Sequence, residues 1–503
     1  MHADLVVETT SGPVRGPEVV SRVRRWLGIP YALPPIGPLR FRPPRPAERS
    51  AVVLDASAWG PRCPQPASAL APRRRGEVDS EDCLRLNVWA PSSSGPHPVM
   101  VWVHGGSFTT GSGALSWYDG ARLARAGVVV VTFNYRLGLL GWFHLEPFGG
   151  DEWAGTANLG LADQKLALDW VRHNIEAFGG DAGRVTLFGE SAGAMSVAAH
   201  LADRRIGRSI RAAIAQSGAA THVRSADEAA AGAERALAAL GMHPADLTPG
   251  GIERLRSLPV AELVAPMATP DAAVGRPLGI LPTVDGTWVP EPPLDALRRG
   301  SCADVNLVVG SNADEMRLFM AGVLGSIDDD RLHRRIDRAL LADGIDGDAA
   351  TVASDYRSRH VGASAGELAA AIETDRFFRR GVIATADAQL SGGGRASTYL
   401  FEHESSAFGG LLGSAHAVEI PFVFDNLDAA GVEAFVGAPD HPRPALAHAM
   451  SRAWVDVAVG ATSPFAPHDP SKRRTARIGA EHAPDAIVVD DEPRSWAMRR
   501  WMR

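Results

Sequence analysis

Short apolar runs that end in turn residues are the feature of this sequence that most constrains its fold. Three of them are PVMVWVHGG at 98–106, GVVVVTFNYR at 127–136 and RVTLFGE at 184–190. Each run has the length of one strand and is apolar on both faces. An amphipathic stretch at 159–181 separates the last two runs and has the length of a helix. Buried strands that alternate with helices predict a mainly parallel sheet covered on both sides, which is an α/β core.

Later segments continue this pattern. They comprise apolar runs at 211–218, 305–312 and 397–404, a helical stretch at 444–460 and a short strand at 485–491. Two alanine-rich stretches, near 226–265 and 331–390, are expected to be helical insertions. Because the α/β pattern is uninterrupted, residues 1–503 are expected to form a single domain.

Composition and charge exclude several classes of protein. The 503 residues are 45% hydrophobic and 22% charged, which is typical of a globular chain, and the net charge of −7 offers no basic field for nucleic acid. The first residues carry a charge where a signal peptide needs an apolar run, and no segment has the roughly 18 apolar residues of a membrane span. We therefore expect a cytoplasmic protein, a monomer or weak homo-oligomer, with no nucleic acid or membrane partner.

The pattern Gly-x-Ser-x-Gly, which marks the nucleophile of many serine hydrolases, occurs at both 189–193 and 362–366. At this glycine and serine content, chance produces the pattern in on the order of one in four chains of this length. The surrounding residues must therefore identify the nucleophile, because the functional pattern lies on a sharp turn from a strand into a helix.

Ser364 lacks that context. The residues before it, 355–361, are polar, and Glu367 follows three positions later at the start of a helical run. Ser-x-x-Glu before a helix is a capping box, in which the serine oxygen accepts a hydrogen bond from the third helical N–H and the glutamate reaches back. We predict that Ser364 caps a helix.

Ser191 has the required context. It follows the strand-like run RVTLF and precedes AMSVAAHLA, which enters a helix at once. Gly189 and Gly193 suit a sharp turn in which a strand and a helix crowd together. Residues 104–107, His-Gly-Gly-Ser, leave a strand where this fold supplies donors for an oxyanion. Taken alone, that segment could also be a simple glycine-rich turn.

A series of motifs runs from about residue 10 to residue 460, and consists of GIPYALPPIGPLRF, SEDCLRLNVWAP, HGGSF, NYRLGLLGW, NLGLADQKLALDWVRHNIEAFGGD, FGESAGAMS, QSG, GSNADE and HAVEIPFVF. In these motifs and their order the sequence resembles the type B carboxylesterases, the cholinesterase-like branch of the α/β hydrolases, and is closest in style to bacterial members. The resemblance implies an α/β-hydrolase fold with a large, mostly parallel central sheet, flanking helices, helical cap insertions and serine esterase activity.

The resemblance implies the catalytic residues position by position. It places the nucleophile on Ser191, the acid on Glu315 in GSNADEM and the base on His416 in GSAHAVEIPFVF. The order serine, acid, histidine is also the order expected of this fold. Asp314 stays open as an alternative acid, because its carboxylate is adjacent and chemically equivalent.

The resemblance also implies an oxyanion hole. The backbone amides of Gly106, Ser107 and Ala192 would form it, and Gly105 would allow the close approach. An acyl-enzyme would form on the serine, and water would release it.

Glu190 and Ser217 match family positions that support the triad through hydrogen bonds and water, although ordinary polar residues near a core would look the same. The chemistry needs no cofactor or metal. The three cysteines, Cys63, Cys83 and Cys302, lack the close pairs of a zinc site.

Several residues depart from the family pattern. Ser107 and Met316 stand where the family usually has glycine, and Ala417 where it often does, so Ser107 and Met316 are expected to add side chains near the site. Cys63 and Cys83 match the family's first disulfide pair, but in a reducing cytoplasm they could remain thiols.

Substrate class is less constrained. The segment between these cysteines has no aromatic residue for cation–π binding, which argues against choline esters. Arg73, Arg74 and Arg75 indicate either a solvated loop or a cationic rim that favours acid-bearing esters. A small-molecule ester is the expected substrate. Hydrolysis of an amide or carbamate by the same triad, or a non-catalytic binding role, are the alternatives.

Overall fold

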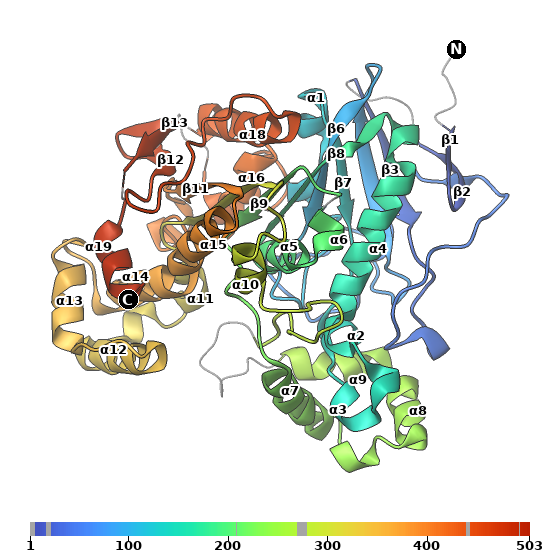
Figure 1. The fold of residues 1–503 in the computed structure, drawn as a ribbon, viewed down its shortest axis with the longest axis horizontal. Coiled ribbons are helices and arrows are strands. Elements are labelled where there is room, and N and C mark those ends of the chain that lie inside the picture. The colour runs from blue at the N-terminus through green and yellow to red at the C-terminus, as the bar shows by residue number, and fades with distance from the viewer. Residues whose placement is uncertain are drawn as a thin grey trace.

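A ten-stranded sheet forms the centre of the computed structural model, which describes residues 6–16, 22–207, 209–268, 279–438, 443–491 and 493–502 (Figure 1). In order across the sheet, its strands are β13 (Ala483–Asp490), β12 (Thr475–Ala480), β11 (Arg395–Phe401), β10 (Asn306–Asn312), β9 (Ala212–Gln216), β8 (Gly180–Glu190), β6 (His97–Val103), β7 (Val129–Phe133), β5 (Arg85–Pro91) and β3 (Val23–Pro30). Neighbours from β12 to β7 are parallel, whereas β13, β5 and β3 pair antiparallel at the edges. A small second sheet joins β1 (Val6–Thr9), β2 (Gly12–Arg15) and β4 (Leu54–Asp55).

The strands follow the apolar runs of the sequence. The run at 127–136 contains β7, and those at 98–106 and 184–190 cover most of β6 and the buried second half of β8, which are neighbours of each other in the sheet. The later runs contain β9 and β10 and overlap most of β11 and β13. The apolar pattern misses β5 and β12. In β12, Arg477 interrupts the apolar residues, and its charge is matched by ion pairs with Glu402 and Asp490.

Helices cover both faces of the sheet. One face carries α4 (Leu159–Asn174), α5 (Ala192–Ala202), α10 (Pro293–Arg298) and α15 (Arg380–Ser391), and the other carries α1 (Ala121–Arg125), α16 (Ile420–Val423) and α18 (Arg443–Val459). Two separate clusters of buried apolar side chains fill the space between the sheet and these layers. This arrangement agrees with the predicted α/β core.

Both predicted insertions are helical. The first holds α7 (Ala226–Ala239), α8 (Pro249–Ser257) and α9 (Val260–Val264), and the second holds α12 (Asp329–Asp343), α13 (Ala349–Arg357), α14 (Ala365–Thr374), a π-helix (Asp375–Arg379) and α15. Figure 1 shows α7 to α9 and α12 to α13 as two groups on the same side of the sheet. Since α15 packs on β10 and β11, the second alanine-rich stretch ends in the helical layer that covers the sheet. That the chain forms a single domain stays a prediction.

The remaining helices are short. They are α2 (Gly138–Trp142), α3 (Glu146–Gly149), α6 (Arg204–Gly207), α11 (Met316–Met320), α17 (Val432–Val436) and α19 (Ser495–Trp501). In the described part of the chain, no helix combines the length and the apolar character needed to cross a bilayer.

Candidate active site

Ser191 lies on the sharp turn between β8 and α5. Its backbone has φ 56° and ψ −123°, a conformation that costs a non-glycine residue on the order of 1–3 kcal/mol. The turn is tight, because a Cβ atom on Gly193 would lie 2.0 Å from the carbonyl oxygen of Val103 in β6. The strand-turn-helix context predicted for Ser191 is therefore present.

Ser364 is the N-cap of α14. Its hydroxyl accepts a 3.3 Å hydrogen bond from the Glu367 N–H, and its own N–H donates to Glu367 Oε2 at 2.8 Å. The predicted capping box is confirmed. Its φ of −66° lies in the ordinary extended region, in contrast to Ser191.

The imidazole of His416 contacts the predicted acid. Its Nδ1 lies 2.6 Å from Glu315 Oε2, and both side chains are buried. Glu315 Oε1 accepts a 2.7 Å hydrogen bond from the Asn312 N–H, which holds the carboxylate in place. Because a carboxylate only accepts hydrogen bonds, the neutral imidazole carries its proton on Nδ1 and leaves Nε2 free to act as a base.

Asp314, the alternative acid, faces other groups. Its Oδ2 accepts a 3.1 Å hydrogen bond from the Ser414 N–H, and its Oδ1 lies 3.6 Å from Arg317 Nε. Glu315 is thus the acid of this pair that contacts His416.

A second carboxylate lies beside the other nitrogen of His416. Glu190 Oε1 is 3.0 Å from Nε2, yet both atoms are buried and neither has a partner in hydrogen-bonding geometry among the described residues. Burial alone would lower the pKa of His416, but the charges of Glu190 and Glu315 outweigh burial and hold that pKa well above its usual value. Burial raises the pKa of Glu190, although the neighbouring imidazole opposes this.

Glu419 is a third buried carboxyl group in this cluster, and the sequence motifs did not assign it a role. Its Oε2 accepts a 2.6 Å hydrogen bond from Asn312 Nδ2, and its Oε1 accepts one of 3.2 Å from Gln216 Nε2. Burial, with the charges of Glu190 and Glu315, raises the pKa of Glu419 to about 8. This shift favours the protonated form of Glu419. The sequence signal for Glu419 is its place as the single acidic residue in the apolar run AVEIPFVF. Burying a carboxylate costs free energy unless it has hydrogen-bond or ion-pair partners.

Free backbone N–H groups lie next to Ser191. Those of Gly106 and Ser107 donate to no other described residue, and Ala192 begins α5, where an N–H has no acceptor within the helix. A Cβ atom on Gly105 would lie only 3.1 Å from Ser191 Cβ, so the loop approaches the nucleophile closely. These features support the predicted oxyanion hole.

Ser217 follows β9 at the edge of the same turn. The Ser191 N–H donates to the carbonyl oxygen of Gln216 at 2.8 Å. The Ser217 hydroxyl is buried and has no hydrogen-bond partner among the described residues. An unpaired hydroxyl in this position suits a bound water, which agrees with the predicted supporting role.

A cavity of about 470 Å³ opens onto Ser191, Glu190 and His416. Its apolar wall is formed by Pro66, Ala67, Leu70, Ala71, Leu115, Trp117, Tyr118, Met267, Phe319, Ala417 and Ile420. Within the described ranges, neither lysine nor arginine lines the cavity, and its charged side chains are Glu190 and His416.

The departures from the family pattern fall in different places. Ser107 and Ala417 line the cavity, as a residue beside the nucleophile or the base should. Met316 does not, because it is buried in the apolar cluster formed by α11, α12 and α14. The expectation that Met316 adds its side chain to the site is therefore wrong.

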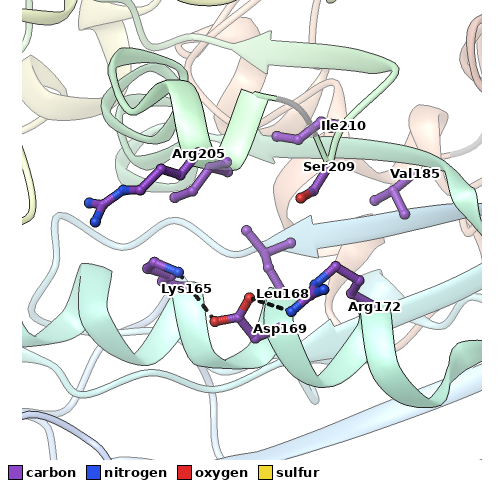
Figure 2. Close-up of a pocket in the computed structure, with 9 residues that line it drawn as sticks. Lys165, Leu168, Asp169, Arg172, Val185, Arg205, Ser209 and Ile210 are labelled. Carbon is purple, nitrogen blue, oxygen red and sulfur yellow. Dashed lines mark hydrogen bonds and ion pairs between the residues drawn. The ribbon is translucent and has the colours of Figure 1, made fainter.

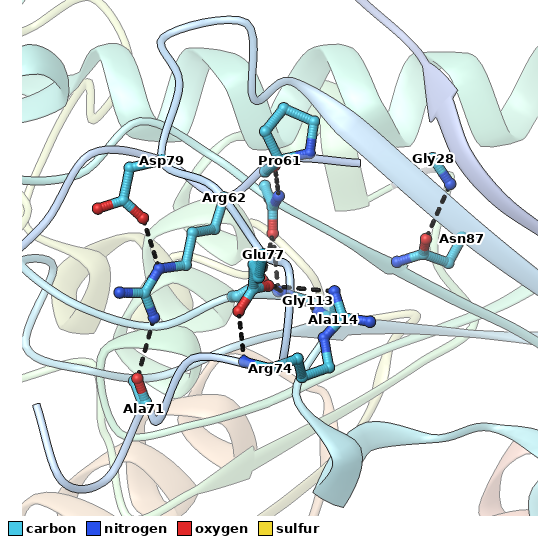
Figure 3. A network of polar contacts seen from close by, with 12 residues as sticks. Gly28, Pro61, Arg62, Ala71, Arg74, Glu77, Asp79, Asn87, Gly113 and Ala114 are labelled. Carbon is cyan, nitrogen blue, oxygen red and sulfur yellow. Dashed lines mark hydrogen bonds and ion pairs between the residues drawn. The ribbon is translucent and has the colours of Figure 1, made fainter. Parts of the chain in front are cut away.

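The three consecutive arginines lie on the loop between the cysteines. Arg73 is paired with Asp79. Figure 3 shows Arg74, whose Nη2 lies 3.1 Å from Glu77 Oε1. The Arg74 guanidinium also stacks 4.4 Å above the Trp59 ring. Since two of the charges are matched by carboxylates and all three side chains lie outside the cavity lining, the structure favours a solvated loop over a cationic rim.

Cys63 and Cys83, at the two ends of this loop, are buried and unbridged. A hydrogen bond with Cys63, together with burial, raises the pKa of the Cys83 thiol. The structure thus shows the thiol form of the two states that the sequence left open.

A second pocket, of about 30 Å³, lies between α4 and the chain near Ser209 (Figure 2). It has room for about one water molecule. Its Lys165 and Arg172 both pair with Asp169, at 3.2 and 3.8 Å. Across the described ranges, no group of three or more His, Cys, Asp or Glu side chains is arranged to hold a metal ion.

Comparison with known proteins identifies the relatives of this chain. A sequence model described as the carboxylesterase family matches residues 3–459. The para-nitrobenzyl esterase of Bacillus subtilis (strain 168) is 35% identical, over 97% of both chains. The fumonisin B1 esterase of Sphingopyxis macrogoltabida is 36% identical, over 90% of this chain and 82% of its own.

Solved structures agree with these relatives. The carboxylesterase EST55 of Geobacillus stearothermophilus superimposes with a TM-score of 0.85 at 35% identity, over 99% of this chain and 100% of its own. A PNB esterase superimposes with a TM-score of 0.83 at 33% identity, over 100% and 99%. Together with the parallel sheet and its two helical layers, these matches confirm the predicted α/β-hydrolase fold.

Proposed function

The chain belongs to the carboxylesterase family and is a carboxylic ester hydrolase, and from that premise we propose that it acts through Ser191, His416 and Glu315. The observation that carries the proposal is the 2.6 Å contact between His416 Nδ1 and Glu315 Oε2, which leaves Nε2 on the cavity side, next to the strained turn of Ser191.

The proposed reaction has two halves. In the first, the Ser191 hydroxyl attacks the ester carbonyl while its proton passes to His416 Nε2, and the amides of Gly106, Ser107 and Ala192 stabilise the oxyanion. The proton then goes to the departing alcohol, and the acyl group stays on Ser191. In the second half, His416 takes a proton from water, which attacks the acyl group, and the same proton passes to the Ser191 oxygen as the acid is released.

Glu315 and Glu190 have different parts in this proposal. Glu315 holds the imidazole in the tautomer that acts as a base and stabilises the imidazolium that forms. Glu190, 3.0 Å from Nε2, favours the same positive charge. Ser217 would hold a water beside this group.

The lining of the cavity favours uncharged esters. Many of its lining side chains are apolar, no described lysine or arginine is among them, and Glu190 brings a carboxylate to the lining. A carboxylate on the substrate would therefore lose hydration without gaining a lysine or arginine partner. We propose neutral small-molecule esters as substrates in preference to acid-bearing ones.

Hydrolysis of p-nitrophenyl esters with graded acyl chains tests the function, alongside an amide and a carbamate. Esters should react fastest, and the hemiglutarate ester should react much more slowly than the valerate ester of similar size. The Arg74→Ala, Arg75→Ala variant should keep that ratio, because neither side chain lines the cavity. Ser191→Ala should be inactive, and full activity in this variant would refute the mechanism.

A further inference from the structure

The cavity wall formed by residues 66–71, called here the wall segment, has little to fix its own position. Leu70 lines the cavity yet is 38% exposed, and Ala71 is the buried member of the segment. Its backbone hydrogen bonds within the segment are local, such as that from the Ala71 N–H to the Ser68 carbonyl oxygen at 3.3 Å. A surface segment with few buried contacts depends on its anchors for a defined position.

A buried arginine holds the end of the wall segment. Arg62 is 1% exposed and donates from Nη1 to the Ala71 carbonyl oxygen at 3.0 Å (Figure 3). Its Nε donates to Asp79 Oδ1 at 2.7 Å, which orients the guanidinium. Charge-assisted bonds of this length inside the protein are the strong ones.

A buried amide holds the start of the wall segment. Gln65 is 4% exposed, and its side chain pairs with both backbone groups of Gly111, donating to the carbonyl oxygen at 2.9 Å and accepting from the N–H at 2.8 Å. Gly111 packs against the loop that contains Gly105, Gly106 and Ser107, since a Cβ atom on Gly111 would lie 2.5 Å from the Gly105 carbonyl oxygen. Gln65 thus ties the wall segment to the loop beside the nucleophile.

We infer that Arg62 and Gln65 are positioning residues that fix the wall segment, and that they thereby set the preference of the site for bulky over small esters. The inference rests on the proposed ester hydrolysis at Ser191. Cys63 and Cys83 are unbridged, so no disulfide closes the loop that carries the wall segment. A bulky ester packs on the wall segment, whereas a small ester bound at Ser191 does not reach it.

The Arg62→Met variant tests this inference with two esters, 1-naphthyl phenylacetate and methyl acetate. Because the wall segment loses its hydrogen bond at Ala71, KM for the bulky ester should rise about tenfold, while kcat for that ester stays within about twofold. For methyl acetate, both KM and kcat should stay within about twofold. The Arg62→Lys variant keeps a buried donor, so its KM for the bulky ester should lie between those of the unchanged protein and Arg62→Met. Asp79 retains Arg73 as a partner in both variants.

Arg184→Met is the matched control. Arg184 also donates from Nε to an aspartate, Asp181, at 2.7 Å and from Nη2 to a carbonyl oxygen, that of Pro96, at 2.8 Å, but it lies away from the cavity. This variant should leave both esters unchanged. Should Arg62→Met fail to fold, Gln65→Met carries the same expectation. An equal loss on both esters, or an unchanged KM for the bulky ester, would overturn the inference, whereas an active Ser191→Ala would instead overturn the proposed function.

Discussion

At the scale of single residues, the site combines backbone strain with a dense cluster of charge. Ser191 adopts φ 56° and ψ −123°, a conformation that suits glycine. His416 lies between Glu315, at 2.6 Å, and Glu190, at 3.0 Å. The strain at Ser191 costs stability, and the two carboxylates shift the pKa of His416. Both effects can be measured.

The strain at Ser191 predicts a trade between stability and activity. Glycine relieves the strain, whereas alanine keeps the Cβ atom and with it the strain. After allowing for the extra freedom of glycine in the unfolded chain, the Ser191→Gly variant should have a free energy of unfolding about 1 kcal/mol above that of Ser191→Ala. Urea unfolding of the two inactive variants measures this difference, and a less stable glycine variant would contradict it.

The carboxylates around His416 predict the direction of a pH shift. Catalysis needs neutral His416, so kcat/KM rises with pH through the pKa of the imidazole. Glu190 helps to raise that pKa, so Glu190→Gln should lower it and move the acid limb of the profile to lower pH. The limb is measured from kcat/KM for a neutral ester between about pH 5 and 9.

Glu419→Gln is the matched control for this shift. Glu190 Oε1 lies 3.0 Å from His416 Nε2 and its charge raises the pKa of the imidazole, whereas Glu419 binds Asn312 and Gln216 instead. The limb should therefore move less than in Glu190→Gln. A Glu190→Gln limb that stays in place or moves to higher pH would contradict the proposed contact.

At the scale of elements, local patterns predicted most of the strands but not all of the irregular features. The runs that became β6, β7 and β8 are apolar throughout, because these strands are buried on both faces. In β12 an arginine with two acidic partners broke the pattern, and those partners lie elsewhere in the sequence. The π-helix at Asp375–Arg379, which joins α14 to α15, had no local signal either.

The capping box of α14 supports a prediction about stability alone. Ser364→Ala should lower the free energy of unfolding by about 1 kcal/mol, because the Glu367 N–H loses its acceptor. Turnover should stay near normal. Ser364→Asp, which preserves an N-cap acceptor, should recover most of the stability. Urea unfolding and ester hydrolysis measure the two effects, and a large loss of activity in Ser364→Ala would contradict the assignment of Ser364 as a cap.

At the scale of the whole molecule, the fold brings together groups that are far apart in the sequence. The motifs identified Ser191, Glu315 and His416 by their neighbours in the sequence, and in the structure these residues follow β8, β10 and β11, which are parallel and end at the same edge of the sheet. The raised pKa of Glu419 and the burial of Met316 away from the cavity could not be predicted from the sequence, because each depends on neighbours contributed by distant segments.

The proposed role of Ser191 as the nucleophile is tested by stoichiometric labelling with a p-nitrophenyl alkylphosphonate, followed by peptide mapping by mass spectrometry, since the reagent stays on the serine that attacks it. We expect one phosphonyl group per chain, on the peptide that contains Ser191, with loss of activity in proportion to labelling. Inactivation with the label on Ser364, or with Ser191 unmodified, would contradict it.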